Sequence, residues 1–311
     1  MLGIEQIAVH LPAGRASNLA LRETFDVDEF FLTEKIGVLE RAVKTPGSTT
    51  SDLALAALQT LIEQRGLSRG QIEALVVVTQ NPDTNMPHVS ALLQARAQLP
   101  DACAAFDISL GCSGYVYGVS VLQAFLAANG LSRGVLVTCD PYSKIIDPAD
   151  KSTVLLFGDA ATATLIGPDP VLLCGPFTFG TQGDLAGALS CRDGVLHMNG
   201  REVFNFAATV VPRDIARLLD RAELKKEDVD CFLFHQGSRY IVETLAKRIG
   251  LEKSKVRMDI LRTGNTVSSS IPLLLAEEID NPTVRTMVLS GFGVGLSWSS
   301  CVCKKVGERN G

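Results

Sequence analysis

The run AAFDISLGCSGYVYGVSVLQAFLAAN, residues 104–129, links a short apolar segment to a longer apolar segment through a turn of small residues. Residues 105–110 have the composition of a buried strand. The second segment has apolar side chains at helical spacing, which predicts a helix packed against a sheet. These side chains are Val116, Val119, Leu122, Phe125 and Leu126. The turn itself, Gly111-Cys112-Ser113-Gly114, presents one thiol.

The position of Cys112 predicts a nucleophile. A tight strand-to-helix turn pushes such a side chain outward, as in the elbow of other α/β enzymes. The positive end of the following helix favours negative charge, and the thiolate is the reactive form of cysteine, so we expect a lowered pKa for Cys112. The alternative is a small buried hydrophobic residue, which is what most free cysteines are.

Composition and charge indicate a soluble globular protein with a large core. Of 311 residues, 46% are hydrophobic and 20% are charged, and the net charge is −5. The sequence has no cluster of Lys and Arg, which argues against nucleic acid as the main partner. No apolar run approaches the roughly 20 residues of a membrane span, and the first residues lack the pattern of a secretory signal. We therefore expect a cytoplasmic protein.

The eight cysteines fit free thiols in a reducing compartment. They form no CxxC pair and no Cys-His cluster at zinc spacing, so we expect neither a disulfide framework nor a metal site.

The order of predicted elements recurs along the chain. A helix at residues 51–65 followed by a buried strand at 72–79 resembles a helix at 205–221 followed by a strand at 229–234. Such repetition predicts internal duplication, and the alternation of strands and helices predicts an α/β fold. The remaining predicted elements are a strand at 4–11, a helical region at 18–43, helices at 88–99 and 240–249, and strands at 134–139, 154–166, 256–259 and 286–303.

The polar break at residues 168–170 divides the chain into an N-terminal half, 1–169, and a C-terminal half, 170–311. The first half carries Cys112. In the second half, His235 follows one predicted strand and Asn265 follows the next. Functional groups in α/β sheets gather at the carboxyl ends of strands, so the three side chains can meet in one crevice. Alternatively, His235 caps a helix and Asn265 is a left-handed turn residue.

The order Cys, His, Asn and the residues around each of them resemble the ketoacyl synthase III family of the thiolase superfamily. The matching motifs extend along essentially the whole chain. They are GCSG (111–114), DPAD (147–150), FGDA (157–160), MNGREVF (198–204), FHQG (234–237), GNTVSSS (264–270) and GFGVGLSW (291–298).

This resemblance implies a five-layered αβαβα thiolase-like fold with duplicated halves, working as a homodimer in fatty acid biosynthesis and lipid metabolism. It implies an acyltransferase in which Cys112 accepts an acyl group and then condenses it with malonyl-acyl carrier protein, with His235 and Asn265 assisting decarboxylation. Backbone N–H groups of Cys112 and Val294 would form the oxyanion hole. No cofactor is implied beyond the thioester substrates, which are acyl-CoA or acyl-carrier protein and the malonyl carrier.

The resemblance also assigns residues around the site. Met86 and Phe157 would bound the acyl pocket, with Met86 reaching across the dimer; the alternative for Met86 is simple packing. Lys247 and Arg248 would face acyl carrier protein, although such a pair is more often a solvated helix face. Residues at the positions that hold coenzyme A or pantetheine are Phe31, Lys151, Gly200, Phe204, Gly237 and Ser238.

Several positions depart from the family pattern. The Trp and Arg that clasp adenine are replaced by a stretch in which Phe31 is aromatic and Glu34 is acidic. Lys151 stands in place of an Arg, and a lysine cannot form a two-pronged contact with phosphate. Ser238 replaces an Asn, and Val294 replaces a glycine. These changes weaken the expectation of coenzyme A as acyl donor, whereas a protein-bound pantetheine thioester would not need the adenine clasp; both donors stay open.

Two alternative functions follow from the same motifs. The acyl group on Cys112 could pass to an amine or alcohol, with His235 as general base. The chain could also be a non-catalytic subunit that completes a partner's site, against which the intact Cys, His and Asn argue. Residues 79–84 contain no glutamate, which argues against the branches of the superfamily that place a glutamate base there.

Overall fold

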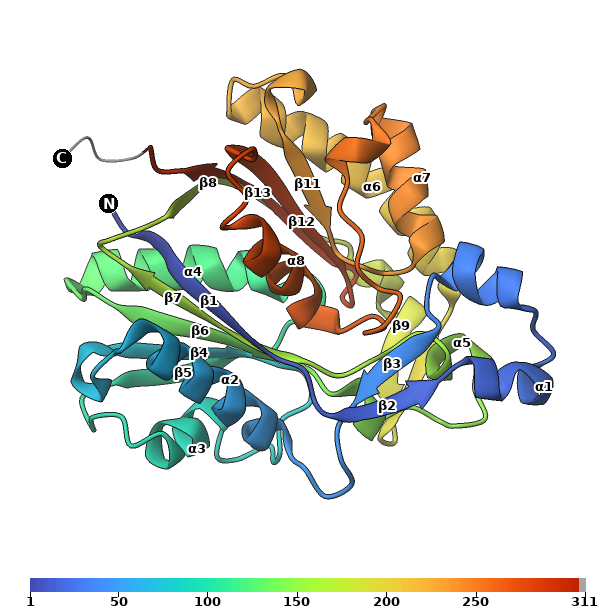
Figure 1. The fold of residues 1–311 in the computed structure, drawn as a ribbon, viewed down its shortest axis with the longest axis horizontal. Helices are drawn as coiled ribbons and strands as arrows, with labels where there is room; N and C mark the ends of the chain where they lie inside the picture. The colour runs from blue at the N-terminus through green and yellow to red at the C-terminus, as the bar shows by residue number, and fades with distance from the viewer. Residues whose placement is uncertain (308–311) are drawn as a thin grey trace.

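Helix α4 (Gly114–Asn129) lies in the middle layer of the computed structural model, which describes residues 1–307 (Figure 1). It contacts strands on both sides, and this double burial explains why it is apolar on nearly every face. Gly114 and Gly118 permit the close approach. A Cβ atom at Gly114 would lie 2.4 Å from Val78, and one at Gly118 would lie 2.7 Å from Leu136.

The main sheet has nine strands in the order β11-β12-β13-β8-β1-β7-β6-β4-β5. Its two blocks join through a single residue pair, Ile4 of β1 and Leu172 of β8. The strands are β1 (Gly3–His10), β4 (Ala74–Val78), β5 (Ala104–Ile108), β6 (Gly134–Cys139), β7 (Ala161–Gly167), β8 (Leu172–Thr181), β11 (Cys231–Phe234), β12 (Thr286–Gly293) and β13 (Ser297–Lys305). Two small pairs accompany them: β2 (Gly14–Ser17) with β3 (Glu40–Val43), and β9 (Leu189–Arg192) with β10 (Val195–Met198).

The two blocks of the main sheet have the same internal plan. From the junction outward, β1, β7, β6 and β4 are matched by β8, β13, β12 and β11. In each block two antiparallel pairings come first and a parallel pairing follows. The plan is consistent with the predicted duplication; the division at residues 169 and 170 stays a prediction, and residues 308–311 lie outside the described part.

Helices cover the outer face of each block and fill the space between the two blocks, which gives five layers (Figure 1). Helices α2 and α3 cover the first block, α4 and α8 lie between the blocks, and α6 and α7 lie over the second block. The helices are α1 (Arg22–Phe25), α2 (Thr50–Arg65), α3 (Val89–Arg96), α5 (Lys151–Val154), α6 (Gly200–Arg221), α7 (Arg239–Ile249) and α8 (Ser270–Glu278). The predicted thiolase-like fold is confirmed.

Most predicted elements appear in place, but three predictions were wrong in part. The region 18–43 is helical at Leu19–Leu21, α1 and Phe31–Ile36; its end is strand β3, because it pairs with β2. The strand predicted at 154–166 starts only at Ala161. Residues 256–259 make a single bridge, Phe232 to Val256. In each case the extent of the strand depends on the segment with which it pairs, and the local apolar pattern does not specify that segment.

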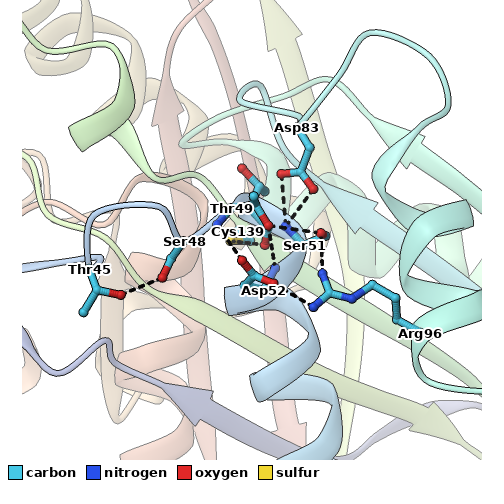
Figure 2. Close-up of polar contacts among 9 residues, drawn as sticks. Thr45, Ser48, Thr49, Ser51, Asp52, Asp83, Arg96 and Cys139 are labelled. Atoms are coloured by element: carbon cyan, nitrogen blue, oxygen red, sulfur yellow. Dashed lines mark hydrogen bonds and ion pairs between the residues drawn. The ribbon is translucent and has the colours of Figure 1, made fainter.

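The N-terminus of α2 anchors the loop that follows β4 (Figure 2). Thr49 caps the helix: its side chain accepts from the backbone N–H of Asp52, and Asp52 accepts from the N–H of Thr49 at 2.8 Å. The carboxylate of Asp83 accepts from the N–H of Ser51 at 3.2 Å, and Arg96 bridges Ser51 and Asp52. The loop carrying Asp83 and Met86 is thus fixed to the outer helical layer.

Among residues 1–307, none of the helices has the length and apolar character needed to cross a membrane.

We predict that Thr49→Ala lowers the free energy of unfolding by about 1 kcal/mol, because an N–H group at the helix start loses its acceptor. Urea unfolding followed by circular dichroism measures the change. Thr49→Ser keeps the hydroxyl and serves as the control. Equal stability of the alanine variant and the wild type would show that the cap contributes nothing.

Candidate active site

A cavity of about 750 Å³ runs from the surface to Cys112 and is lined by residues of both halves of the chain. Its mouth includes the exposed side chains of Lys35, Lys151 and Arg201. Cys112, His235 and Asn265 are buried on its inner wall, at 4%, 3% and 3% exposure. The structure therefore brings together the three side chains that the sequence places 123 and 30 positions apart.

Cys112 lies in the turn between β5 and α4, against strand β12. Backbone N–H groups of Cys112 itself and of Val294 donate toward its sulfur. Glycines on β12 make this contact feasible: a Cβ atom at Gly291 would lie 2.5 Å from the Cys112 carbonyl oxygen, and one at Gly293 would lie 2.8 Å from the Cys112 sulfur. The two N–H groups predicted to form an oxyanion hole thus already point at the reacting atom.

His235 directly follows β11, and its ring is held on two sides. Its Nδ1 atom lies 2.8 Å from the hydroxyl oxygen of Ser270, and the ring meets Phe292 edge-on with 5.5 Å between centroids. The backbone N–H of His235 donates to the carbonyl of Ser290 at 2.8 Å. The imidazole therefore has one fixed orientation, with Nε2 on the side of Asn265.

Asn265 is tied to the first half of the chain. Its N–H donates to the carbonyl of Leu156 at 2.8 Å, and its carbonyl accepts from Gly158 at 3.0 Å. Its side-chain oxygen accepts from the N–H of Val267 at 2.9 Å, which leaves the Nδ2 amide group 3.4 Å from Nε2 of His235. Two nitrogen atoms that can donate hydrogen bonds thus lie side by side on the cavity wall.

A buried carboxyl group lies close enough to Cys112 to raise the pKa of its thiol. Asp140, which the sequence analysis did not identify, accepts from the N–H of Gln80 at 2.7 Å and from the hydroxyl of Ser268. Burial raises the pKa of Asp140 to about 6. No local pattern marks this residue, because its hydrogen-bond partners come from two other segments, Thr79-Gln80 and Ser268.

The expected lowering of the Cys112 pKa is wrong. Burial raises the pKa of Cys112 to about 12, the charge of Asp140 raises it further, and the N–H groups of Cys112 and Val294 oppose both effects. Burial lowers the pKa of His235 to about 3. In the resting protein both groups are neutral at pH 7, because the apolar cavity disfavours their charged forms.

The residues predicted to hold pantetheine or coenzyme A all lie on the cavity wall: Phe31, Lys151, Gly200, Phe204, Gly237 and Ser238. Lys151 lies 5.2 Å above the ring of Phe31. Tyr240, which the sequence analysis missed, stacks on Phe204 at 5.2 Å, and Lys35 lies over its ring at 5.1 Å. The binding roles of these residues stay predictions.

The predicted acyl-pocket and carrier-binding residues lie in different surroundings. Phe157 lines the cavity, whereas Met86 is 86% exposed and lies outside it, so its reach into a partner subunit stays a prediction. Lys247 and Arg248 are exposed on α7, and Arg248 donates to the carbonyl of Ala208 at 2.8 Å. Within residues 1–307, no group of three or more His, Cys, Asp or Glu side chains could hold a metal ion.

Comparison with known proteins gives consistent matches along the chain. The family model for 3-oxoacyl-(acyl-carrier-protein) synthase III matches residues 106–183, and the model of its C-terminal part matches residues 219–305. The β-ketoacyl-(acyl-carrier-protein) synthase III of Lactococcus lactis subsp. cremoris is 32% identical over 96% of this chain and 98% of its own length.

Solved structures agree with the sequence matches. A crystal structure of a 3-oxoacyl-(acyl-carrier-protein) synthase III superposes with a TM-score of 0.92 at 35% identity, covering 97% of this chain and 99% of the other. The 3-oxoacyl-(acyl-carrier protein) synthase of Burkholderia xenovorans gives 0.90 at 33% identity, covering 98% and 94%.

We predict that alkylation of Cys112 by iodoacetamide accelerates by about tenfold per pH unit between pH 7 and pH 10, because the thiolate fraction grows throughout this range when the thiol pKa is raised. Mass spectrometry of the Cys112 peptide measures the rate, and the exposed Cys191 serves as an internal reference for the reagent. A rate independent of pH would mean that the thiolate already exists at pH 7.

Proposed function

The chain belongs to the 3-oxoacyl-(acyl-carrier-protein) synthase III family, and on this premise we propose that it condenses an acyl thioester with malonyl-acyl carrier protein. The products are a 3-oxoacyl thioester and carbon dioxide, so the enzyme is an acyltransferase of the condensing type. The observation that carries this proposal is the pairing of Nε2 of His235 with Nδ2 of Asn265, 3.4 Å apart on the wall that also holds Cys112.

In the first half-reaction, the sulfur of Cys112 attacks the carbonyl carbon of the acyl donor. The N–H groups of Cys112 and Val294 stabilise the oxyanion, a contribution of about 2.7–4 kcal/mol for each such hydrogen bond. The carbon–sulfur bond of the donor breaks, and the thiol proton leaves with the departing carrier thiol. The half-reaction therefore needs no net proton and leaves an acyl group on Cys112.

In the second half-reaction, the malonyl thioester loses carbon dioxide. The electron pair of the broken carbon–carbon bond forms an enolate, whose oxygen accepts hydrogen bonds from His235 and Asn265. The enolate carbon attacks the acyl carbon, and the carbon–sulfur bond to Cys112 breaks. The departing sulfur then takes one proton from solvent, which restores the thiol. Neutral donors suffice here, because the departing carbon dioxide creates the carbanion without a base.

The neutrality of His235 favours condensation over acyl transfer to an amine or alcohol. That alternative requires His235 to remove a proton from the acceptor, and an imidazole with a pKa of about 3 is a weak base. A non-catalytic subunit would have no need of the ordered Cys112, His235 and Asn265 arrangement.

The charges around Glu34, the neighbour of the cavity-lining Lys35, favour a carrier-bound donor. Glu34 lies 3.4 Å from Arg239, which also pairs with Glu243 at 2.9 Å, so this guanidinium is neutralised by two carboxylates. Lys151 donates to the carbonyl of Phe25 at 3.0 Å and covers Phe31. An acyl carrier protein presents only phosphopantetheine here and needs no adenine site. The exposed Lys247 and Arg248 would contact the acidic surface of this carrier. We also propose that the enzyme is a homodimer and works in the cytoplasm.

We predict that Cys112→Ala forms no acyl-enzyme, whereas Asn265→Ala still forms it but releases carbon dioxide on the order of 10²–10³ more slowly, as expected for loss of one oxyanion donor. Mass spectrometry of the intact protein detects the acyl group, and labelled malonyl-acyl carrier protein reports carbon dioxide. An acyl adduct on Cys112→Ala, or wild-type protein that releases no carbon dioxide with any acyl donor, would contradict the proposal.

We further predict that Lys247→Glu slows acylation by acyl-carrier protein several-fold at low ionic strength, because the favourable charge contact is reversed. Acylation by a short pantetheine thioester should stay at the wild-type rate, since Lys247 lies outside the wall of the cavity that would hold it. Lys304→Glu, an exposed substitution on β13, is the matched control. Equal slowing by both variants would assign the effect to net charge alone.

A further inference from the structure

Ser270, the first residue of α8, contacts the edge of the His235 ring opposite to the cavity, where Nδ1 lies. Its hydroxyl oxygen lies 2.8 Å from Nδ1 of His235 and 3.0 Å from the carbonyl oxygen of Val267. The N–H of Gln236 also donates toward it at 3.4 Å. The side chain is 2% exposed, so solvent does not compete for these contacts.

The hydroxyl has one proton and two acceptors within reach. If it donates to Val267, then Nδ1 of His235 must carry the ring proton and donate to the hydroxyl. If it donates to Nδ1, the ring proton lies on Nε2, beside Asn265. A neutral imidazole has one ring proton, so the orientation of this hydroxyl selects between the two tautomers.

The proposed reaction requires the second arrangement, since only a protonated Nε2 donates to the enolate oxygen. Building on the proposed function, we propose that Ser270 is a positioning residue that donates its hydroxyl proton to Nδ1 of His235 and thereby holds the ring proton on Nε2, toward the cavity. Both tautomers carry one ring proton, so this preference changes neither the net charge nor the number of protons in the site.

The backbone at Val267 makes the hydroxyl necessary. Val267 adopts a left-handed conformation with φ of 54°, which is uncommon for a β-branched residue. This conformation directs its N–H to Asn265 and its carbonyl toward both Ser270 and His235. Without the hydroxyl, the Val267 carbonyl would favour the tautomer in which Nδ1 carries the ring proton and Nε2 is unprotonated.

The two half-reactions respond differently to loss of this hydroxyl. Attack by Cys112 uses the N–H groups of Cys112 and Val294, which do not involve Ser270. Enolate formation uses Nε2 of His235, which loses its proton in the other tautomer. Ser270→Ala should therefore retain acylation and slow carbon dioxide release on the order of 10²-fold, the effect of one lost donor.

Nitrogen NMR of ¹⁵N-histidine-labelled protein tests the tautomer directly, because protonated and unprotonated ring nitrogens have distinct shifts. The chain has four histidines, and His235→Gln identifies the signals of His235 by their loss. We expect Nε2–H in the wild type and Nδ1–H in Ser270→Ala. A wild type with Nδ1–H, or an alanine variant that keeps Nε2–H and decarboxylates normally, would overturn the proposal.

Ser269→Ala is the matched control. Ser269 is the buried neighbour of Ser270, but its hydroxyl contacts Thr138 and Ala160 rather than His235. It should keep the Nε2–H tautomer and the ratio of the two half-reaction rates. The wild-type spectrum remains decisive if Ser270→Ala does not fold. It also separates the two proposals, since it reads the tautomer even if the protein releases no carbon dioxide.

Discussion

The burial of α4 between two sheet blocks is the constraint on which the site depends. A helix covered on both sides must be apolar nearly all round, and Gly114 and Gly118 let it approach the strands of the first block. At its N-terminus the same packing presses Cys112 against β12, where Gly291 and Gly293 leave room for it. Cys112 is therefore held by the helix that lies between the two blocks, next to strand β12 of the second half.

In the second half, the strained backbone at Val267 helps to orient both Asn265 and His235. Left-handed backbone at a β-branched residue costs on the order of 1–3 kcal/mol, and it persists where surrounding contacts enforce it. At Val267 these contacts are the side chain of Asn265 on the N–H and the hydroxyl of Ser270 on the carbonyl. A single backbone conformation thus orients the amide of Asn265 and, through Ser270, the imidazole of His235.

The electrostatics of the cavity suit chemistry without free charges. Its inner wall is apolar and buried, which keeps the Cys112 thiol and the His235 imidazole neutral. In the proposed reaction, fixed N–H donors stabilise the oxyanions, and such donors act most strongly where water is excluded. The charged side chains lie at the mouth, where solvent screens them and where a carrier would approach.

The sequence by itself determined the architecture and the identity of the reacting groups. Apolar periodicity predicts α2, α4 and the buried strands, because a buried face requires apolar side chains at regular spacing. The motifs around Cys112, His235 and Asn265 identify the three residues, because the proposed chemistry requires those residue types. Tertiary structure alone decided the pairing of β3 with β2, the burial of Asp140 near Cys112 and the contact of Ser270 with His235. Each of these joins separate segments, and no local sequence pattern indicates that the segments meet. It also reversed the expected acidity of Cys112: a helix N-terminus can be read from sequence, but the depth of burial that outweighs it depends on every layer around the turn.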